Sequence, residues 1–173
     1  MLSNFIEIFL LLSPVFFLII LGNILRRIRV PDISFWDLSD GPDIKEVIEA
    51  LRDRSKSLVD MAKNCVMFYH DFEDFDSDLA IKFFNLESRS VLGDLLINLE
   101  TLDQWSAENI HEVIQSICES RNIGFGKVGQ PLRLAISGDG KAGSIDKSAQ
   151  LVGKKRVLLR LKMAIDWIDS LPL

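Results

Sequence analysis

A long apolar segment near the N-terminus limits how this chain of 173 residues can fold. Between Phe5 and Leu25, 16 of the 21 residues are Leu, Ile, Phe or Val. About 20 residues of this kind cross the ~30 Å hydrocarbon core of a bilayer as a helix. The insertion free energies of 16 such residues sum to roughly −5 to −10 kcal/mol. The sequence therefore predicts a membrane-spanning helix, with membrane contact through residues 5–25.

Three arginines predict the orientation of this helix. Arg26, Arg27 and Arg29 follow the apolar segment directly, whereas no Lys or Arg precedes it. By the positive-inside rule the N-terminus then lies outside and the rest of the chain in the cytoplasm. The predicted localisation is a single-pass protein of the inner membrane. A cleaved signal peptide is the alternative, but the basic residues are on the wrong side and no A-x-A site follows.

The remainder of the chain is predicted to be all α. Apolar residues recur at helical spacing, and no strand-like alternation of useful length occurs. The pattern predicts a long helix at 44–66, short helices near 77–84 and 88–99, a helix that Ser106 caps, and a final helix near 154–168. The predicted organisation is an anchor with a basic flank at 1–30, a linker at 31–42 and one helical domain at 43–170.

Charge is unevenly distributed along the chain. Residues 41–120 carry 7 basic and 17 acidic side chains, whereas residues 121–173 carry 10 basic and 4 acidic ones. A polyanion would therefore bind at the C-terminal third. The same basic residues could also form an ordinary solvated face or lie against anionic lipid.

Neither a metal nor a cofactor is expected. Cys65 and Cys118 form no CxxC pair and lie on apolar stripes, which is typical of buried, reduced thiols. His70 and His111 have no partner at zinc-ligand spacing. The glycine-rich stretch 138–144 lacks the residue order of a phosphate-binding loop.

Several short motifs occur in the order that one enzyme family uses. They are LRDRSKSL at 51–58 followed by Met61-Ala62, Phe68-Tyr69 before an acidic patch, WSAE at 105–108, GKVGQPLR at 126–133, Ser137-Gly138, Ser144-Ile145 and the Leu-x-Gly-Lys element at 151–154. With these motifs, residues 41–168 resemble the C-terminal anticodon-binding domain of bacterial glutamyl-tRNA synthetase. The resemblance implies a helical cage with halves at 43–104 and 105–170, the second of which receives the anticodon loop.

The resemblance also implies where tRNA would bind. Arg133 would contribute to reading an anticodon base, since its planar fork of donors suits base edges or phosphate. A surface ion pair is the alternative for this side chain. Gly143 stands where the family usually has Pro, which loosens the loop that would pack beside the anticodon. The predicted tRNA-binding residues are Lys127, Gln130, Arg133, Lys141, Ser144 and Ile145.

The N-terminal segment carries a second resemblance. Residues 1–37 resemble the first transmembrane helix of the auxin efflux carrier family, in the Leu-Gly-x-x-Leu-Arg-Arg run at 21–27 and in Phe35-Trp36. Transport is not implied, because that family uses about ten spans and this sequence predicts one.

Together these patterns predict a membrane-tethered, non-catalytic module that binds tRNA, with tRNA-Glu as the partner and a full-length synthetase as a further one. The chain alone is not expected to aminoacylate, because we find no HIGH-like or KMSKS-like signature. One alternative is a helical interaction module at the membrane that does not bind RNA. Another is a fusion or fragment gene product without independent function, joined near residues 37–41.

Overall fold

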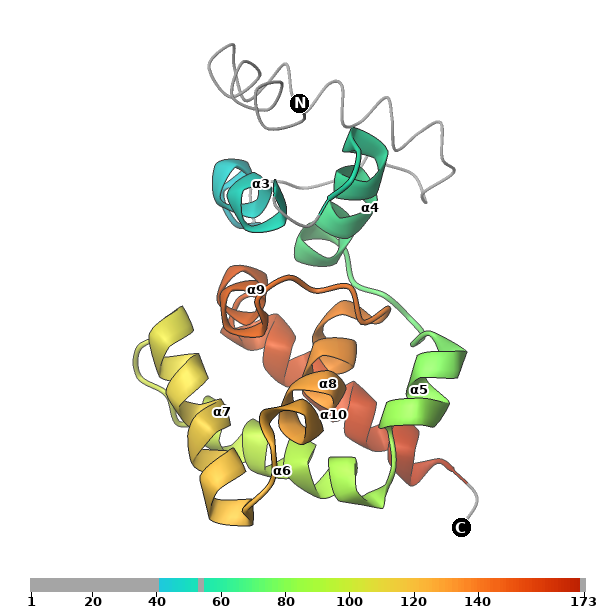
Figure 1. Ribbon diagram of the computed structural model, residues 1–173, viewed down its shortest axis with the longest axis vertical. Coiled ribbons are helices and arrows are strands. Elements are labelled where there is room, and N and C mark those ends of the chain that lie inside the picture. Colours follow the sequence, from blue (N-terminus) through green and yellow to red (C-terminus); the bar gives the residue numbers. More distant parts are fainter. Residues whose placement is uncertain (1–40, 53–54, 172–173) are drawn as a thin grey trace. The chain divides into compact units, whose positions relative to one another are not determined.

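The described part of the chain is helical. The computed structural model describes residues 41–52 and 55–171, and within them it has eight helices and no strand (Figure 1). The helices are α3 (Ile44–Arg52), α4 (Leu58–Tyr69), α5 (Ser77–Phe83), α6 (Leu86–Glu100), α7 (Ala107–Arg121), α8 (Phe125–Ser137), α9 (Ile145–Val152) and α10 (Lys154–Asp169). The all-α prediction is confirmed for these residues.

The predicted membrane helix, residues 5–25, lies outside the described residues. Among the helices that the structure does describe, none combines the length and the apolar character needed to cross a bilayer. The chain divides into two compact units, residues 1–71 and residues 72–173.

The first unit contains α3 and α4, where the sequence predicted one long helix. Helix α3 ends at Arg52, and α4 starts after Ser57, whose backbone is extended and whose hydroxyl accepts a hydrogen bond from the Asp60 amide at 3.1 Å. The Asp60 carboxylate in turn accepts from the Lys56 amide at 3.0 Å. This reciprocal capping satisfies amides that a new helix start exposes. A local polar signal therefore overrides the continuous apolar periodicity.

The two helices of the first unit share an apolar contact. Cys65 is fully buried, and burial raises the pKa of its thiol to about 12. The Tyr69 hydroxyl donates to the Pro42 carbonyl at 3.0 Å. A Cβ at Gly41 would lie 2.4 Å from the Tyr69 ring, so a glycine is needed for this close approach. The buried side chains of α3 and α4 include Val47, Ile48, Leu51, Met61, Ala62 and Phe68.

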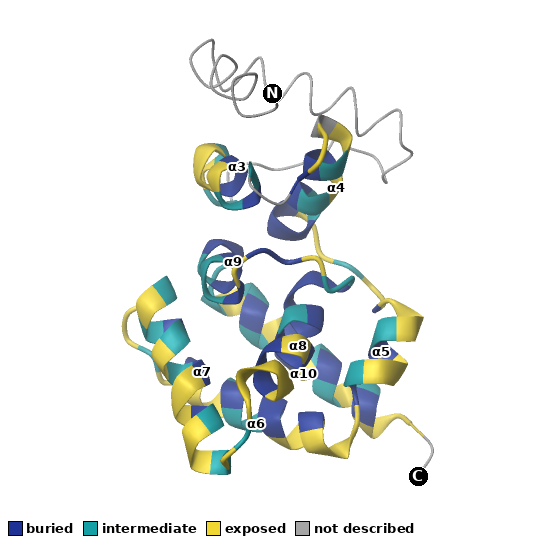
Figure 2. Ribbon diagram, in the orientation of Figure 1, coloured by how far each residue is buried: buried dark blue, intermediate teal, exposed yellow. Residues whose placement is uncertain are grey.

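In the second unit α10 packs against α6 and α8, and α7 packs against α6, α8 and α9. In the view of Figure 1, α7 and α9 lie on one side of α8 and α5 lies on the other. Figure 2 shows the buried residues on the facing sides of these helices and the exposed residues on their outer sides. The fully buried aliphatic side chains include Leu92, Leu95, Leu99, Ile110, Ile114, Leu132, Ile136 and Leu161.

Aromatic rings from the start of the second unit reach its core. Phe75 lies edge to face with Phe72 and with Phe84, at centroid distances of 5.4 and 5.0 Å. The Phe84 ring also lies 5.5 Å from that of Trp167 on α10. The Asp76 carboxylate accepts from the Leu79 amide at 3.0 Å and so caps α5. The segment 72–76 is therefore anchored on both its apolar and its polar side.

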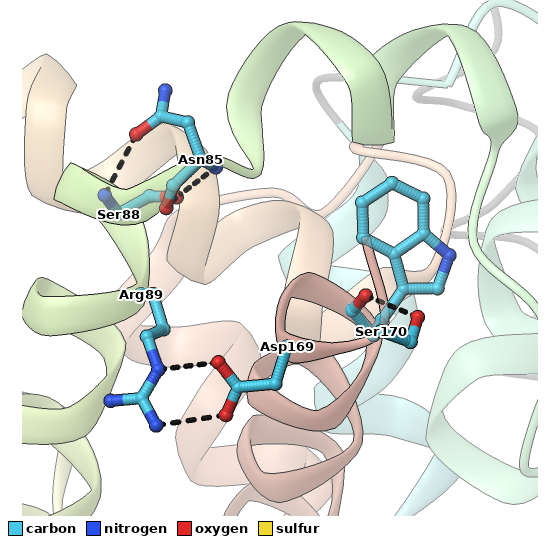
Figure 3. A network of polar contacts seen from close by, with 6 residues as sticks. Asn85, Ser88, Arg89, Asp169 and Ser170 are labelled. Carbon is cyan, nitrogen blue, oxygen red and sulfur yellow. Dashed lines mark hydrogen bonds and ion pairs between the residues drawn. The ribbon is translucent and has the colours of Figure 1, made fainter. Parts of the chain in front are cut away.

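Polar contacts fix α6 at its start and along its first turn (Figure 3). Asn85 and Ser88 form a capping box, in which each side chain accepts from the other residue's amide at 3.0 and 2.8 Å. One turn on, the Arg89 guanidinium pairs with both carboxylate oxygens of Asp169, at 2.6 and 2.8 Å. The end of α10 is thereby held beside the start of α6.

Candidate nucleic-acid interface

The predicted RNA motif at 126–133 forms most of helix α8. Val128 and Leu132 are fully buried, so one side of the helix belongs to the core. Pro131 lies inside the helix and has no amide hydrogen, so it cannot donate to the Lys127 carbonyl one turn earlier. A proline inside a helix costs roughly 3 kcal/mol relative to alanine. Burial of the apolar side of α8 offsets this cost, at about 1.5–3 kcal/mol for each large aliphatic side chain.

The C-terminal end of α8 is held from two directions. Gly138 ends the helix in the left-handed region, with φ of 76°, and its carbonyl accepts from the Asp76 amide at 2.8 Å. From α10, the Arg160 side chain, only 3% exposed, donates to the Ile136 carbonyl at 2.7 Å. The Arg160 guanidinium also lies 5.0 Å from the centroid of the Phe72 ring. A buried positive charge at this position complements the negative end of the helix dipole.

The loop from Gly138 to α9 is a compact turn. Gly140 is left-handed, with φ of 71°. The Asp139 carboxylate accepts from the Lys141 amide at 3.0 Å and pairs with the Lys141 ammonium at 3.1 Å. Ser144 is exposed and precedes α9, whereas the Ile145 side chain is only 3% exposed and packs in the core.

Asp146, in the first turn of α9, links the loop to α7. Its carboxylate accepts from the Ser144 hydroxyl and lies 3.4 Å from His111 Nδ1. Burial opposes ionisation, but hydrogen bonds from the Ser144 hydroxyl and the Lys147 amide, with the charge of His111, hold the Asp146 pKa below its ordinary value. The carboxylate is therefore ionised at neutral pH and orients the His111 ring.

The structure places the six predicted tRNA-binding residues in two groups on packed elements. Lys127, Gln130 and Arg133 lie on α8, and Lys141, Ser144 and Ile145 lie on the following loop and the start of α9; α8 and α9 pack against each other. Four of the six are exposed, Arg133 is half-buried and Ile145 is buried. Lys127 pairs with Glu87 at 2.9 Å, with both side chains more than half exposed. Their roles in binding RNA stay predictions.

The sequence did not predict the aromatic pair at the start of α8. The ring centroids of Phe125 and His111 are 6.3 Å apart, with 33° between their planes. A Cβ at Gly129 would lie 2.9 Å from the Phe125 ring, so the ring rests against that glycine. The one available signal was a phenylalanine between two glycines, at 124 and 126.

A pocket of about 240 Å³ lies near the same end of α8. Gly126, Lys127 and Pro131 line it from α8, and Phe83 and Asn85 line it from the junction of α5 and α6. The ion-paired side chains of Lys127 and Glu87 are also among its lining residues.

Comparison with known proteins identifies the family of this helical domain. A family model described as anticodon binding domain matches residues 12–165. The chain belongs to this family.

Two of the curated proteins that match this chain are glutamate–tRNA ligases. The chain is 54% identical over 130 residues to the glutamate–tRNA ligase of Vesicomyosocius okutanii subsp. Calyptogena okutanii (strain HA), and 50% identical over 129 residues to that of Ruthia magnifica subsp. Calyptogena magnifica. Each alignment covers 75% of this chain and 28% of the relative. The chain thus spans little more than a quarter of the length of these relatives.

Solved structures agree with this assignment. A glutamate tRNA ligase from Elizabethkingia meningosepticum CCUG26117, in complex with its amino acid, superposes with a TM-score of 0.68 at 25% identity, over 92% of this chain and 30% of that one. A glutamate-tRNA synthetase from Elizabethkingia anophelis has the same fold, with a TM-score of 0.61 at 24% identity and the same coverage.

These comparisons correct the predicted localisation. A single-pass inner-membrane protein was the wrong prediction, because the anticodon binding match begins at residue 12 and so includes most of residues 5–25. The resemblance of residues 1–37 to an auxin efflux carrier helix, and the membrane as a partner, are not supported for the same reason. An apolar run has the same composition whether lipid or protein surrounds it, so periodicity and composition could not separate the two cases.

Proposed function

We propose that this chain is a tRNA-binding module that recognises the anticodon end of tRNA-Glu. The observation that carries the proposal is the motif at 126–133, which lies on one ordered helix of an anticodon binding domain with exposed polar side chains beside a half-buried arginine. High identity to two glutamate–tRNA ligases over 75% of this chain supports the choice of tRNA.

Arg133 is the proposed base-reading residue. Its position on α8 is fixed by the held C-terminal end of the helix, where Arg160 and Asp76 bind the last carbonyls. A guanidinium that is held in place loses less side-chain entropy when it forms paired hydrogen bonds. Gln130 and Ser144 would add hydrogen bonds, and Lys127 and Lys141 would contact phosphates, because all four are exposed.

We further propose that residues 43–170 act as one anticodon-binding module, with Ile145 packing beneath the loop that faces the RNA. Arginine, lysine, amide and hydroxyl groups supply donors and positive charge, which suit binding rather than bond making. Aminoacylation is not proposed for these residues. A full-length synthetase remains a candidate partner.

A titration with tRNA tests the proposal. The full chain should bind fluorescein-labelled tRNA-Glu in fluorescence anisotropy, and Arg133→Ala should raise Kd by about 10- to 100-fold, since charged hydrogen bonds contribute roughly 1.5–3 kcal/mol. Lys162→Ala is the matched control, because Lys162 is exposed on α10 outside the proposed site. Absence of binding at low salt would refute the proposal and favour a helical interaction module that does not use RNA.

A further inference from the structure

Two aromatic rings from different helices lie together at the surface of the second unit. Phe125 is 43% exposed at the start of α8, and the His111 side chain on α7 is also 43% exposed. Their planes are 33° from parallel. A phenylalanine ring normally stabilises the fold through the apolar surface that it buries. The nearly half of Phe125 that stays in solvent does not contribute in this way.

Both rings are held in position from below. Gly129, one turn after Phe125, has no side chain, and a Cβ there would come within 2.9 Å of the ring. His111 is oriented by Asp146 at 3.4 Å, and Asp146 is itself held by the Ser144 hydroxyl. The rings are therefore positioned by α8 and by the start of α9, the two elements that carry the predicted tRNA-binding residues.

The backbone beside Phe125 leaves its outer side open. Gly124 and Gly126 flank Phe125, and a Cβ built on either would meet no described atom within 4 Å apart from its chain neighbours and the nearby backbone of its own helix. With Phe125 43% exposed and no side chain on either flanking residue, part of its surface is open to a flat ligand.

The nearby charges select the kind of ligand. Asp146 faces His111 from α9, and Glu108 and Glu112 are exposed on α7. The Glu108 pKa is lowered, chiefly by a backbone hydrogen bond within its own residue and by the Ser106 side chain. These carboxylates disfavour a phosphate placed directly on the rings, and the nearby Lys147, whose charge also lowers the Glu108 pKa, offsets part of this repulsion. The part of an RNA expected to contact the rings is therefore the face of a base rather than its phosphate.

We propose that Phe125 and His111 form a stacking platform for one unpaired nucleobase of the RNA loop. This inference rests on the proposed function. Phe125, Gly129 and Arg133 follow one another at intervals of four residues along α8, so they share one side of the helix. At 1.5 Å per residue, the platform lies about 12 Å along the helix axis from Arg133. The stacked base would thus belong to the same loop as the base that Arg133 is proposed to read.

The experiment places a fluorescent base in the RNA. An anticodon stem-loop of tRNA-Glu sequence is made with 2-aminopurine at each loop position in turn, and the full chain is titrated into each. Stacking should quench the 2-aminopurine emission at one position. Phe125→Leu should abolish this quenching and raise Kd by about 5- to 100-fold, the effect of losing one base–aromatic stack. Phe125→Trp should keep both signals, because it keeps an aromatic face.

Two more variants separate stacking from other effects. Gly129→Ala should displace the ring and reduce the quenching while leaving Phe125 in the sequence. Leu159→Ala, which removes a 58% exposed apolar side chain from α10, should change neither signal. The dependence of Kd on salt should be the same in Phe125→Leu as in the unmodified chain, because no phosphate contact is removed.

The outcomes distinguish this inference from the proposed function. If the unmodified chain binds RNA and Arg133→Ala weakens binding, but Phe125→Leu retains both quenching and Kd, the platform is refuted and the proposed function stands. A smaller salt dependence in Phe125→Leu would also refute stacking. If the unmodified chain binds no RNA, both proposals fail together. Circular dichroism of each variant shows whether the helical fold is kept.

Discussion

The two ends of α8 differ in how the rest of the molecule holds them. At the C-terminal end, a buried arginine from α10 and the Asp76 amide bind the carbonyls of Ile136 and Gly138. At the N-terminal end, Phe125 is exposed between two glycines whose surroundings are open. The same helix thus has one end that is part of the core and one that is available to a ligand. Substitutions at the two ends should therefore have different effects, on stability at one and on binding at the other.

The largest effect is expected from Arg160→Ala. This change removes the donor to the Ile136 carbonyl and leaves space beside Phe72 in a buried position. The free energy of unfolding should fall by about 2–4 kcal/mol, from the lost hydrogen bond and the cavity together. Urea denaturation measures the change, with Lys162→Ala on the same helix as the exposed control. A loss below about 0.5 kcal/mol would show that this end of α8 is not held as described.

Gly138→Ala should come next. A non-glycine residue in the left-handed region costs about 1–2 kcal/mol, and the added Cβ would lie 3.0 Å from the Phe72 ring. We expect a decrease of about 1–3 kcal/mol in the free energy of unfolding and a matching fall in Tm. An unchanged Tm would mean that the loop can rearrange without cost.

Gly126→Ala, at the other end of the same helix, should have the opposite sign. A Cβ there meets open space, and alanine favours the helix over glycine, so stability should rise by about 0.5–1 kcal/mol. Thermal unfolding gives the sign directly. A less stable Gly126→Ala variant would contradict the proposed difference between the two ends of α8. It would show that atoms pack closely around Gly126.

The smallest effect is a dependence on pH at Asp146. Because the pKa of this carboxyl is lowered in the folded chain, its contribution to stability is present at neutral pH and is lost as the pH falls through the folded pKa. Asp146→Asn should therefore be less stable than the unmodified chain near neutral pH, and the difference should shrink and then vanish as the pH falls below the folded pKa of Asp146. Urea denaturation at several pH values tests this. A difference that grows in acid would show that the sign is wrong.

Local sequence rules predicted much of the fold. Ser106 was predicted to cap a helix, and its hydroxyl accepts from the Asn109 amide at 3.2 Å at the start of α7. The final helix was predicted within a residue or so of α10. Both predictions depend on residues at most four positions apart. The break between α3 and α4 shows the limit, because the apolar periodicity continued past the end of α3 at Arg52 and across Ser57, which caps the start of α4.

The candidate site was less predictable, because its parts come from distant positions. His111 seemed isolated in the sequence, yet it faces Asp146, 35 positions later, and Phe125. Arg160 was one of many basic residues in the C-terminal third, and only packing shows that it is the buried one. Pairings of this kind follow from how helices pack, which periodicity alone does not specify.

Pro131 should make the N-terminal turn of α8 easier to open than the rest of the helix. Without an amide at this position, the first turn of the helix is tied to the rest by one hydrogen bond fewer than usual. Amide hydrogens before residue 131 should therefore exchange with solvent faster than those near Ile136, through local opening that leaves the core intact. The N-terminal turn of α8 can then adjust locally when RNA binds, while the C-terminal end of the helix stays packed in the core.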